Sequence, residues 1–223
     1  MILTQINFSY KDIKQNKIYT IYDIHKNIWK LFDAENRKKQ GERILFADKG
    51  MVKDKRKVLV MSDTPAKENN FDMNFKEIPE NYLNYDLYNF EININPVKKC
   101  PSLKKLLSIT NYNEISDWFI KKANSHGFSV VPASLMVNKV TATEFTKSIC
   151  SYTECKKENK ATATELTKCN GNKLIKVVLN TANITGILKV TDRNKFIDSV
   201  HYGIGRGKAY GHGLLQITPA SIF

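Results

Sequence analysis

The 223-residue sequence predicts an α+β fold in two tandem domains. Short stretches in which apolar and polar residues alternate, as in strands, are interspersed with stretches of helical periodicity. The first half follows the order β-α-β-β-(α)-β, which is the ferredoxin-like (RRM-like) split motif. The second half repeats this order loosely, and Pro96 lies between them. We therefore expect one domain at residues 1–95 and a second at residues 96–223.

The first half contains the clearest elements. Ile2 to Tyr10 alternates as a strand does, and Thr20 can cap a helix that runs to about Asp33. The apolar residues of this helix recur at helical spacing and form one stripe. Downstream we expect a short second helix and three strands: a helix within Asn69 to Tyr82, and strands at Arg43 to Ala47, Lys57 to Met61 and Tyr85 to Asn95.

The second half begins with a helix capped by Asn111 or Asn113 and stopped near Gly127. Asp192 can cap a later helix, which leads into a glycine-rich stretch. Strands are expected at Phe128 to Val140, Leu174 to Leu179, Ile184 to Val190 and Leu214 to Thr218.

A Thr/Lys-rich insertion, about residues 139–173, interrupts this pattern. Thr-Ala-Thr-Glu occurs at Thr141 and again at Thr162, and each copy is followed by an apolar residue, Thr and Lys. A solvated, locally duplicated hairpin or loop is the favoured interpretation, and a basic ribbon laid along RNA is the alternative.

The charge is distributed unevenly. The net charge of +13 divides into +2 for residues 1–95 (16 basic against 14 acidic) and +11 for residues 96–223 (19 against 8). This asymmetry predicts a polyanionic partner bound mainly by the second half. However, most of the basic residues are lysine and the chain is rich in Asn and Ile, so biased codon usage is an alternative explanation.

Several function classes are disfavoured. The chain has no apolar run that could span a membrane and no signal-peptide pattern after Met1, so we expect a cytoplasmic protein. The four cysteines form no C-x-x-C pair, and we expect free thiols. The scattered carboxylates offer no magnesium site. We therefore expect neither a metal nor a cofactor.

The first candidate site lies on the helix after Thr20. Tyr22, His25 and Trp29 form a second stripe beside the apolar one, and side chains three apart on a helix are neighbours. The phenol and the imidazole could therefore act on one substrate atom, and imidazole titrates near neutral pH, as proton transfer requires. Taken alone, the pattern favours a different interpretation, in which His25 is a hydrogen-bonded core residue.

The second candidate site is the glycine-rich stretch from Gly203 to Leu215, which includes Arg206 and Lys208. Five glycines within eleven residues, interrupted by two cations, suit a loop whose backbone N–H groups approach phosphate oxygens. A flexible turn is the alternative.

A lysine run also follows Pro96, where a solvated surface is the usual explanation. The expected RNA-binding residues are Lys26, Lys98, Lys99, Lys104, Lys105, Gly203, Gly205, Arg206, Lys208, Gly211 and Gly213.

Together these segments resemble the CasE-type endoribonucleases of type I-E CRISPR systems, a branch of the RAMP superfamily. The segment from Tyr22 to Phe32 looks like that family's Y-x-x-H-x-x-ϕ-W-x-ϕ-F element, where ϕ is apolar, and Arg43 to Phe46 is similar to the element that follows it. Asn95-Pro96 and the stretch from Gly203 to Leu215 also resemble family elements. The resemblance therefore extends over nearly the whole chain.

The resemblance implies a metal-independent endoribonuclease that cleaves CRISPR precursor RNA within the repeat, at the base of its hairpin. By position, His25 matches the catalytic histidine and Tyr22 the active-site tyrosine. The product RNA would stay bound, and the other partners would be subunits of the RNA-guided surveillance complex, with no membrane involved. Two alternatives remain: a non-catalytic hairpin-RNA-binding subunit of the same fold, and an RNA-binding protein unrelated to CRISPR.

Overall fold

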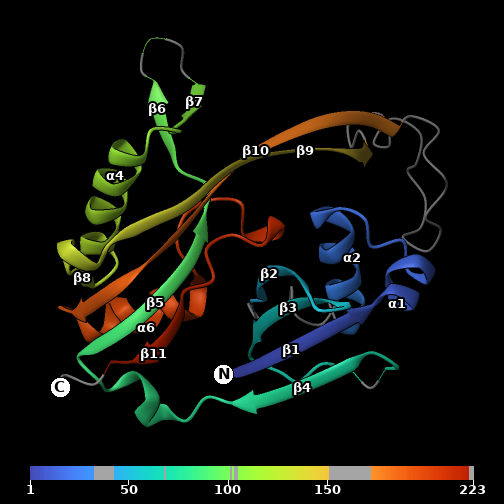
Figure 1. The fold of residues 1–223 in the computed structure, drawn as a ribbon, viewed down its shortest axis with the longest axis horizontal. Coiled ribbons are helices and arrows are strands. Elements are labelled where there is room, and N and C mark those ends of the chain that lie inside the picture. Colours follow the sequence, from blue (N-terminus) through green and yellow to red (C-terminus); the bar gives the residue numbers. More distant parts are fainter. Residues whose placement is uncertain (33–42, 68, 101, 103–104, 151–171, 221–223) are drawn as a thin grey trace, which may run out of the picture.

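The computed structural model describes residues 1–32, 43–67, 69–100, 102, 105–150 and 172–220. A four-stranded and a five-stranded ferredoxin-like sheet, each carrying helices, form the two halves of the molecule (Figure 1). The α+β class and the tandem arrangement expected from the sequence are confirmed. No helix among these residues is long and apolar enough to span a membrane.

The first sheet has the order β2-β3-β1-β4, with antiparallel neighbours. Its central strand alternates strictly between buried and partly exposed residues, so one face is available for the helices. The elements of this half are β1 (Ile2–Ser9), α1 (Tyr10–Gln15), α2 (Ile21–Leu31), β2 (Leu45–Val52), β3 (Lys55–Ser62) and β4 (Asp72–Glu77).

Helix α2 begins at a capping box. The Thr20 hydroxyl accepts from the Asp23 N–H, and the Asp23 carboxylate accepts from the Thr20 N–H at 2.9 Å. Its buried side chains, including Ile24 and Ile28, pack on the first sheet against Ile6 and other apolar residues of the strands. Because that stripe is buried, the flank that carries Tyr22, His25 and Trp29 is only partly covered.

The second sheet has the order β11-β5-β10-β8, and its elements follow the complete β-α-β-β-α-β sequence. A small hairpin, β6 and β7, is inserted after β5. The bounds are β5 (Leu87–Ile94), β6 (Val97–Cys100), β7 (Lys105–Ser108), α4 (Tyr112–Ser125), β8 (Phe128–Val130), β9 (Met136–Cys150), β10 (Asn172–Val190), α6 (Arg193–Tyr202) and β11 (Gln216–Pro219), with one-turn 3-10 segments η1 (Glu80–Leu83), η2 (Pro132–Ser134) and η3 (Lys208–Tyr210).

Two predictions for the first half are wrong. The helix expected within Asn69 to Tyr82 is instead strand β4, which pairs with β1, followed by the short η1. The strand expected to close the first sheet, β5, pairs with β10 and β11 of the second sheet. By strand pairing, the chain thus changes sheets between Glu77 and Leu87, ahead of the predicted boundary at residue 95.

The insertion forms part of a long antiparallel arm. Strands β9 and β10 pair from Met136↔Thr185 out to Cys150↔Asn172, with a register shift near Asn183. The two strand-like runs predicted in this region are therefore one continuous strand of 19 residues. The arm extends from the second sheet across to α2 (Figure 1). Residues 151–171 of the insertion lie outside the described residues.

The two sheets meet at both polar and apolar contacts. Lys49 on β2 forms an ion pair with Glu91 on β5, with an N–O distance of 2.6 Å. Leu45, Ala47 and Met61 of the first sheet belong to the hydrophobic core of the second half. An apolar cavity of ≈ 550 Å³ lies beside this junction.

Candidate functional site

His25 is half-buried on the flank of α2 and is held mainly by aromatic neighbours. The indole Nε1–H of Trp29, one helical turn further on, donates a hydrogen bond to His25 Nδ1 at 3.0 Å. The two rings meet edge to face, with centroids 5.6 Å apart. Phe46 of β2 contacts the imidazole as well, at a centroid distance of 6.3 Å. The ring is therefore fixed in position before any substrate arrives.

Tyr22 lies next to His25, as the helical spacing predicted. The two rings are stacked, with centroids 6.2 Å apart and planes within 18°. Lys26 Nζ lies 4.4 Å from the centre of the Tyr22 ring, in cation–π geometry, and forms an ion pair with Asp23 at 3.4 Å. A phenol, an imidazole and an ammonium group thus occupy one flank of α2.

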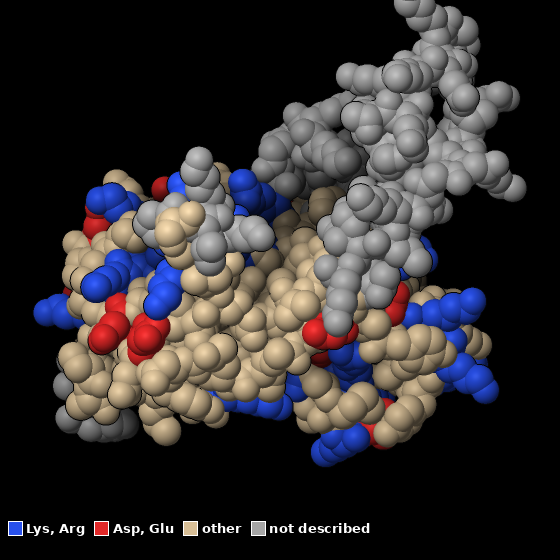
Figure 2. Space-filling view, turned by 90° about the horizontal axis from the view of Figure 1, so that it is seen from above, with Lys and Arg blue, Asp and Glu red and all other residues tan. Residues whose placement is uncertain are grey.

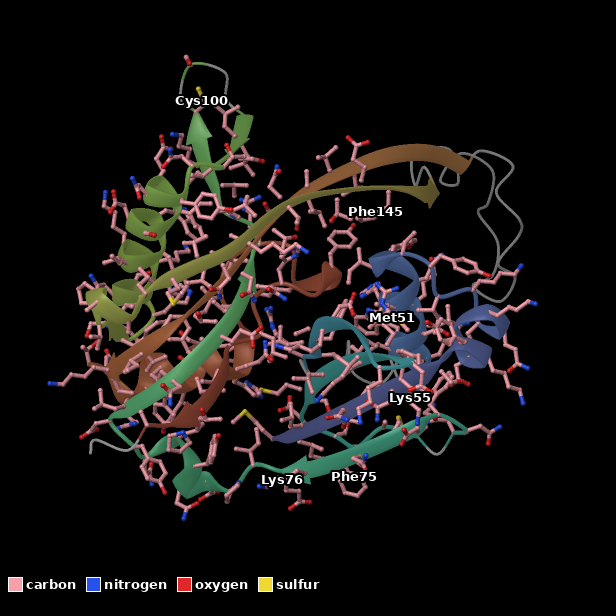
Figure 3. All side chains as sticks on the ribbon, viewed as in Figure 1. Met51, Lys55, Phe75, Lys76, Cys100 and Phe145 are labelled. Atoms are coloured by element: carbon pink, nitrogen blue, oxygen red, sulfur yellow. The ribbon has the colours of Figure 1, made fainter. Side chains whose placement is uncertain are left out.

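Phe145, on β9 of the arm, completes this group from the other half of the molecule. Its ring stacks on Tyr22 with centroids 6.1 Å apart and planes within 12°, and it contacts Tyr210 at 5.0 Å. Phe145 is buried, and Figure 3 shows it beneath the arm, on the side that faces α2. It is absent from the sequence-based candidates, although it is the sole aromatic residue in the described part of the insertion.

The glycine-rich loop packs against the first sheet and α2. Gly203, Gly211 and Gly213 are buried with positive φ, and their N–H groups donate to the carbonyls of Ser199, Lys208 and Asn93. A Cβ atom on Gly213 would lie 2.5 Å from a backbone oxygen, whereas one on Gly205 would meet nothing within 4 Å. Three of the four predicted phosphate-binding glycines therefore serve close packing, and their contact with RNA stays a prediction.

Lys208 belongs to a group of cations drawn from several elements. Its Nζ donates to the carbonyl of Tyr202 at 2.6 Å, and the Arg43 guanidinium lies 5.4 Å from the centre of the Tyr202 ring. Burial and repulsion by Arg43 and Lys122 lower the pKa of Lys208. Burial, Lys122 and Lys208 likewise lower the pKa of His126. We call Arg43, Lys122 and Lys208 the basic cluster.

The other predicted RNA-binding cations lie apart from this cluster. Arg206 is exposed on the loop, and Lys98 and Lys99 are exposed on β6. Lys98 forms an ion pair with Glu114 at 3.0 Å. Lys105 lies on β7, and Lys104 lies outside the described residues. Figure 2 shows Lys and Arg side chains on both halves of one face, with Asp and Glu side chains among them.

A second cavity, of ≈ 720 Å³, adjoins the start of α2 and is lined by Phe145 and Tyr210, among other residues. His212 lies in its wall and is buried, and burial lowers its pKa. Its Nδ1 contacts the Gly207 carbonyl at 3.2 Å, and its Nε2 contacts the Thr181 hydroxyl at 2.7 Å. In the described part of the chain, no three His, Cys, Asp or Glu side chains converge as a metal site requires.

The model of one protein family, the CRISPR associated proteins, matches residues 1–219. The chain belongs to this family. The match confirms the family resemblance carried by the segments at the start, middle and end of the sequence. Among curated proteins, none matches this CRISPR associated protein.

Solved structures of similar fold cover nearly the whole of this CRISPR associated protein. The CRISPR endoribonuclease Cse3 bound to a 19-nucleotide RNA has a TM-score of 0.76 and 18% identity, over 98% of this chain and 100% of that one. Thermus thermophilus Cse3, bound to an RNA representing a pre-cleavage complex, has a TM-score of 0.67 and 16% identity over 98% of both chains. Cas6e from Escherichia coli K-12 has a TM-score of 0.60 and 17% identity, over 99% and 100%. At these identities the likeness establishes the fold.

Proposed function

We propose that this CRISPR associated protein is a metal-independent endoribonuclease that cleaves CRISPR precursor RNA within the repeat. We further propose that it keeps the mature guide RNA as a subunit of the RNA-guided surveillance complex. The observation that carries the proposal is the pairing of Tyr22 and His25 on α2, under the arm of the second domain. The fold shared with RNA-bound Cse3 and with a subunit of a CRISPR RNA-guided surveillance complex supports it.

The proposed reaction uses the groups on α2. The ribose 2′-OH on the 5′ side of the scissile bond attacks the adjacent phosphorus, and the 5′-oxygen leaves. His25 assists as general base or general acid, a contribution typically worth about 10²–10⁴-fold. Tyr22 orients the 2′-OH or a phosphate oxygen. A cation stabilises the charge on the phosphorane. The candidates are Lys26, whose Nζ lies 4.4 Å from the centre of the Tyr22 ring, Arg206 and Lys208.

RNA is held mainly through its backbone. The basic cluster joins the segment before β2 to α4 and the glycine-rich loop, so one stretch of phosphates can contact both domains. Burial, together with repulsion from Arg43 and Lys122, lowers the pKa of Lys208, and an anion that enters the cluster relieves this repulsion. Hairpin recognition rests on shape and backbone contacts, with sequence reading at unstacked bases.

The decisive variant is His25→Ala. We expect cleavage of a repeat RNA to fall by about 10²-fold or more, with affinity for the RNA within a few-fold of wild type. The matched control is Lys30→Ala, on the same helix but exposed. Cleavage by the His25 variant at the wild-type rate would exclude the proposed role.

Cleavage by the wild-type protein should also survive excess EDTA. A loss of activity that magnesium restores without refolding the RNA would contradict metal independence.

The nucleophile is tested on the substrate. A 2′-deoxy nucleotide immediately 5′ of the scissile phosphate should abolish cleavage while binding persists, since the attacking oxygen has been removed. An activated water would tolerate this change. The expected products carry a 2′,3′-cyclic phosphate upstream and a free 5′-OH downstream. A downstream 5′-phosphate in the mass spectrum would rule out the transesterification.

The alternative is a non-catalytic hairpin-RNA-binding subunit of the same fold. It is favoured by one observation: His25 is half-buried and already hydrogen-bonded to Trp29, as a core histidine would be. In that case the wild-type protein binds the repeat RNA tightly but leaves it intact during prolonged incubation. The cleavage assay on the wild-type protein therefore separates the two functions.

A further inference from the structure

The second cavity lies where the two halves of the molecule and the arm meet. Its wall includes residues of α2, β2 and β3 from the first half, and of β5, β9, β10 and η3 from the second. Its volume of ≈ 720 Å³ is within the roughly 300–1,000 Å³ of ligand pockets. Phe145 lines this cavity and stacks on Tyr22, so the cavity adjoins the candidate site (Figure 3).

The charged side chains of the cavity wall balance one another. They are three cations and three anions: Lys49, Arg56, Lys139, Asp48, Glu91 and Glu144. Asp48 and Arg56 form an ion pair with an N–O distance of 2.7 Å, and Lys49 pairs with Glu91 at 2.6 Å. Phosphates are bound by an excess of cations, which this wall does not offer. An uncharged group therefore suits the cavity better than a phosphate does.

Three asparagines on neighbouring strands form a chain of hydrogen bonds in this wall. Asn183 Nδ2 donates to Asn93 Oδ1 at 2.9 Å and to the Glu91 carboxylate at 3.0 Å. Asn138 Nδ2 donates to Asn183 Oδ1 at 2.9 Å and to the Thr185 hydroxyl at 3.0 Å. Asn183 thus uses both of its N–H bonds and its oxygen within the chain.

Glu91 sets the direction of this chain. Burial alone would raise the pKa of Glu91, but hydrogen bonds from Lys49 and Asn183 lower it, so the carboxylate is ionised and can only accept. The amide nitrogen of Asn183 must therefore face Glu91. Consequently Asn93 turns its oxygen toward Asn183, and Asn138 turns its nitrogen toward it. Both outer amides are fixed in orientation.

The two outer asparagines keep hydrogen-bonding capacity for a ligand. Within the described ranges of the chain, neither Asn93 Nδ2 nor Asn138 Oδ1 has a hydrogen-bond partner. The register shift in the arm leaves Asn138 without a paired residue on β10, and such a bulge redirects a side chain. The wall thus presents a donor on β5 and an acceptor on β9. Tyr19, which is 65% exposed, adds an aromatic ring.

We propose that an unpaired nucleobase next to the scissile phosphate enters the second cavity, where Asn93 donates to it and Asn138 accepts from it. A nucleobase is uncharged and carries acceptors and donors along its edges. It also stacks on aromatic side chains, and Tyr19 provides the exposed ring. This proposal rests on the proposed function, since it assigns the cavity to the same RNA whose phosphates the basic cluster binds.

The base is tested with repeat RNAs that carry a 2′-deoxy nucleotide 5′ of the scissile phosphate, so that affinity is measured without cleavage. One abasic nucleotide is placed in turn at each unpaired position on either side of that phosphate. At one position the abasic RNA should bind wild-type protein roughly 5- to 100-fold more weakly than the intact RNA, the value of base stacking. Abasic RNAs that all bind as tightly as the intact RNA would overturn the proposal.

Protein variants test whether that base occupies the second cavity. Asn93→Leu keeps the size of the side chain but removes the donor, and Tyr19→Leu removes the ring at an exposed position. Each should bring the ratio of intact to abasic affinity closer to one. Asn89→Leu, exposed on the same face of β5 but outside this cavity, is the matched control and should keep the wild-type ratio.

A wild-type ratio in both Asn93→Leu and Tyr19→Leu would place the base elsewhere and refute the proposal. If wild-type protein binds unmodified repeat RNA without cutting it, the proposed cleavage fails, while the affinity ratios still decide where the base is bound.

Discussion

Replacing Phe145 by Ala should loosen the arm from α2 and slow cleavage. Phe145 is 7% exposed and contacts two aromatic rings, Tyr22 at 6.1 Å and Tyr210 at 5.0 Å. Each aromatic pair contributes about 0.5–1.5 kcal/mol beyond the burial of its area. Losing both pairs therefore weakens the docked state by roughly 1–3 kcal/mol, which corresponds to a roughly 5- to 150-fold shift toward the undocked arm.

Two assays measure this shift. Hydrogen exchange followed by mass spectrometry should show faster exchange in β9 of the Phe145→Ala variant, since a released arm exposes its amides. Single-turnover cleavage of a repeat RNA should slow, because Tyr22 loses the ring that orients it. Val178→Ala is the matched control, as Val178 lies on β10 of the same arm and is 50% exposed. Exchange and cleavage that match the wild type in Phe145→Ala would refute the reasoning.

Three further predictions concern the loop and its surroundings. Lys208→Ala should make the dependence of log affinity for RNA on log salt shallower by roughly 0.7–0.9, the share of one phosphate, and an unchanged slope in a binding titration would remove Lys208 from the interface. Gly205→Ala should lower the free energy of unfolding by about 1–2 kcal/mol, because alanine is strained at a φ of +82°. Gly213→Ala should lower it further, because its Cβ would also lie 2.5 Å from the Ile204 carbonyl oxygen, and equal urea midpoints for the two variants would contradict the packing role of Gly213. Burial lowers the pKa of His212 from 6.5, so the unfolded chain binds a proton more readily than the folded protein does, and the free energy of unfolding should fall as pH drops below about 6.5. His212→Gln should weaken this pH dependence when unfolding is measured from about pH 8 to pH 5. An unchanged pH dependence would mean that another group titrates.

The elements that local chemistry determines were predictable from the sequence. Thr20 caps α2 as expected, and Asn111 and Asp192 cap the two later helices. In each case a polar side chain bonds to N–H groups two or three residues away, so the signal lies within one short segment. The neighbouring positions of Tyr22 and His25 followed in the same way from helical spacing.

Pairing between distant segments was not predictable. The alternation in β5 indicates a strand, but nothing in Leu87–Ile94 identifies β10 as its neighbour. For β4, the spacing of Phe71, Met73 and Phe75 has the period of a strand, yet Phe75 is 70% exposed, and so weak a pattern does not distinguish a strand from the expected helix. An edge strand that buries little carries little periodicity to detect.

The site shows the same division. Trp29 lies four residues from His25, so its contact is a local property of the helix. Phe145 reaches Tyr22 from more than a hundred residues away, and only the length and course of the arm bring it there. The glycines of the loop suggested a phosphate cradle because glycine permits several conformations, whereas the structure uses Gly203, Gly211 and Gly213 for close packing.

The way the chain divides between its sheets has a consequence for synthesis on the ribosome. Strand β4 completes the first sheet at Glu77, so α2 and its underlying core can fold while the rest of the chain is still being made. Phe145 and the glycine-rich loop emerge much later. Tyr22 and His25 can therefore be in place on α2 before Phe145 and the glycine-rich loop are available to pack beside them.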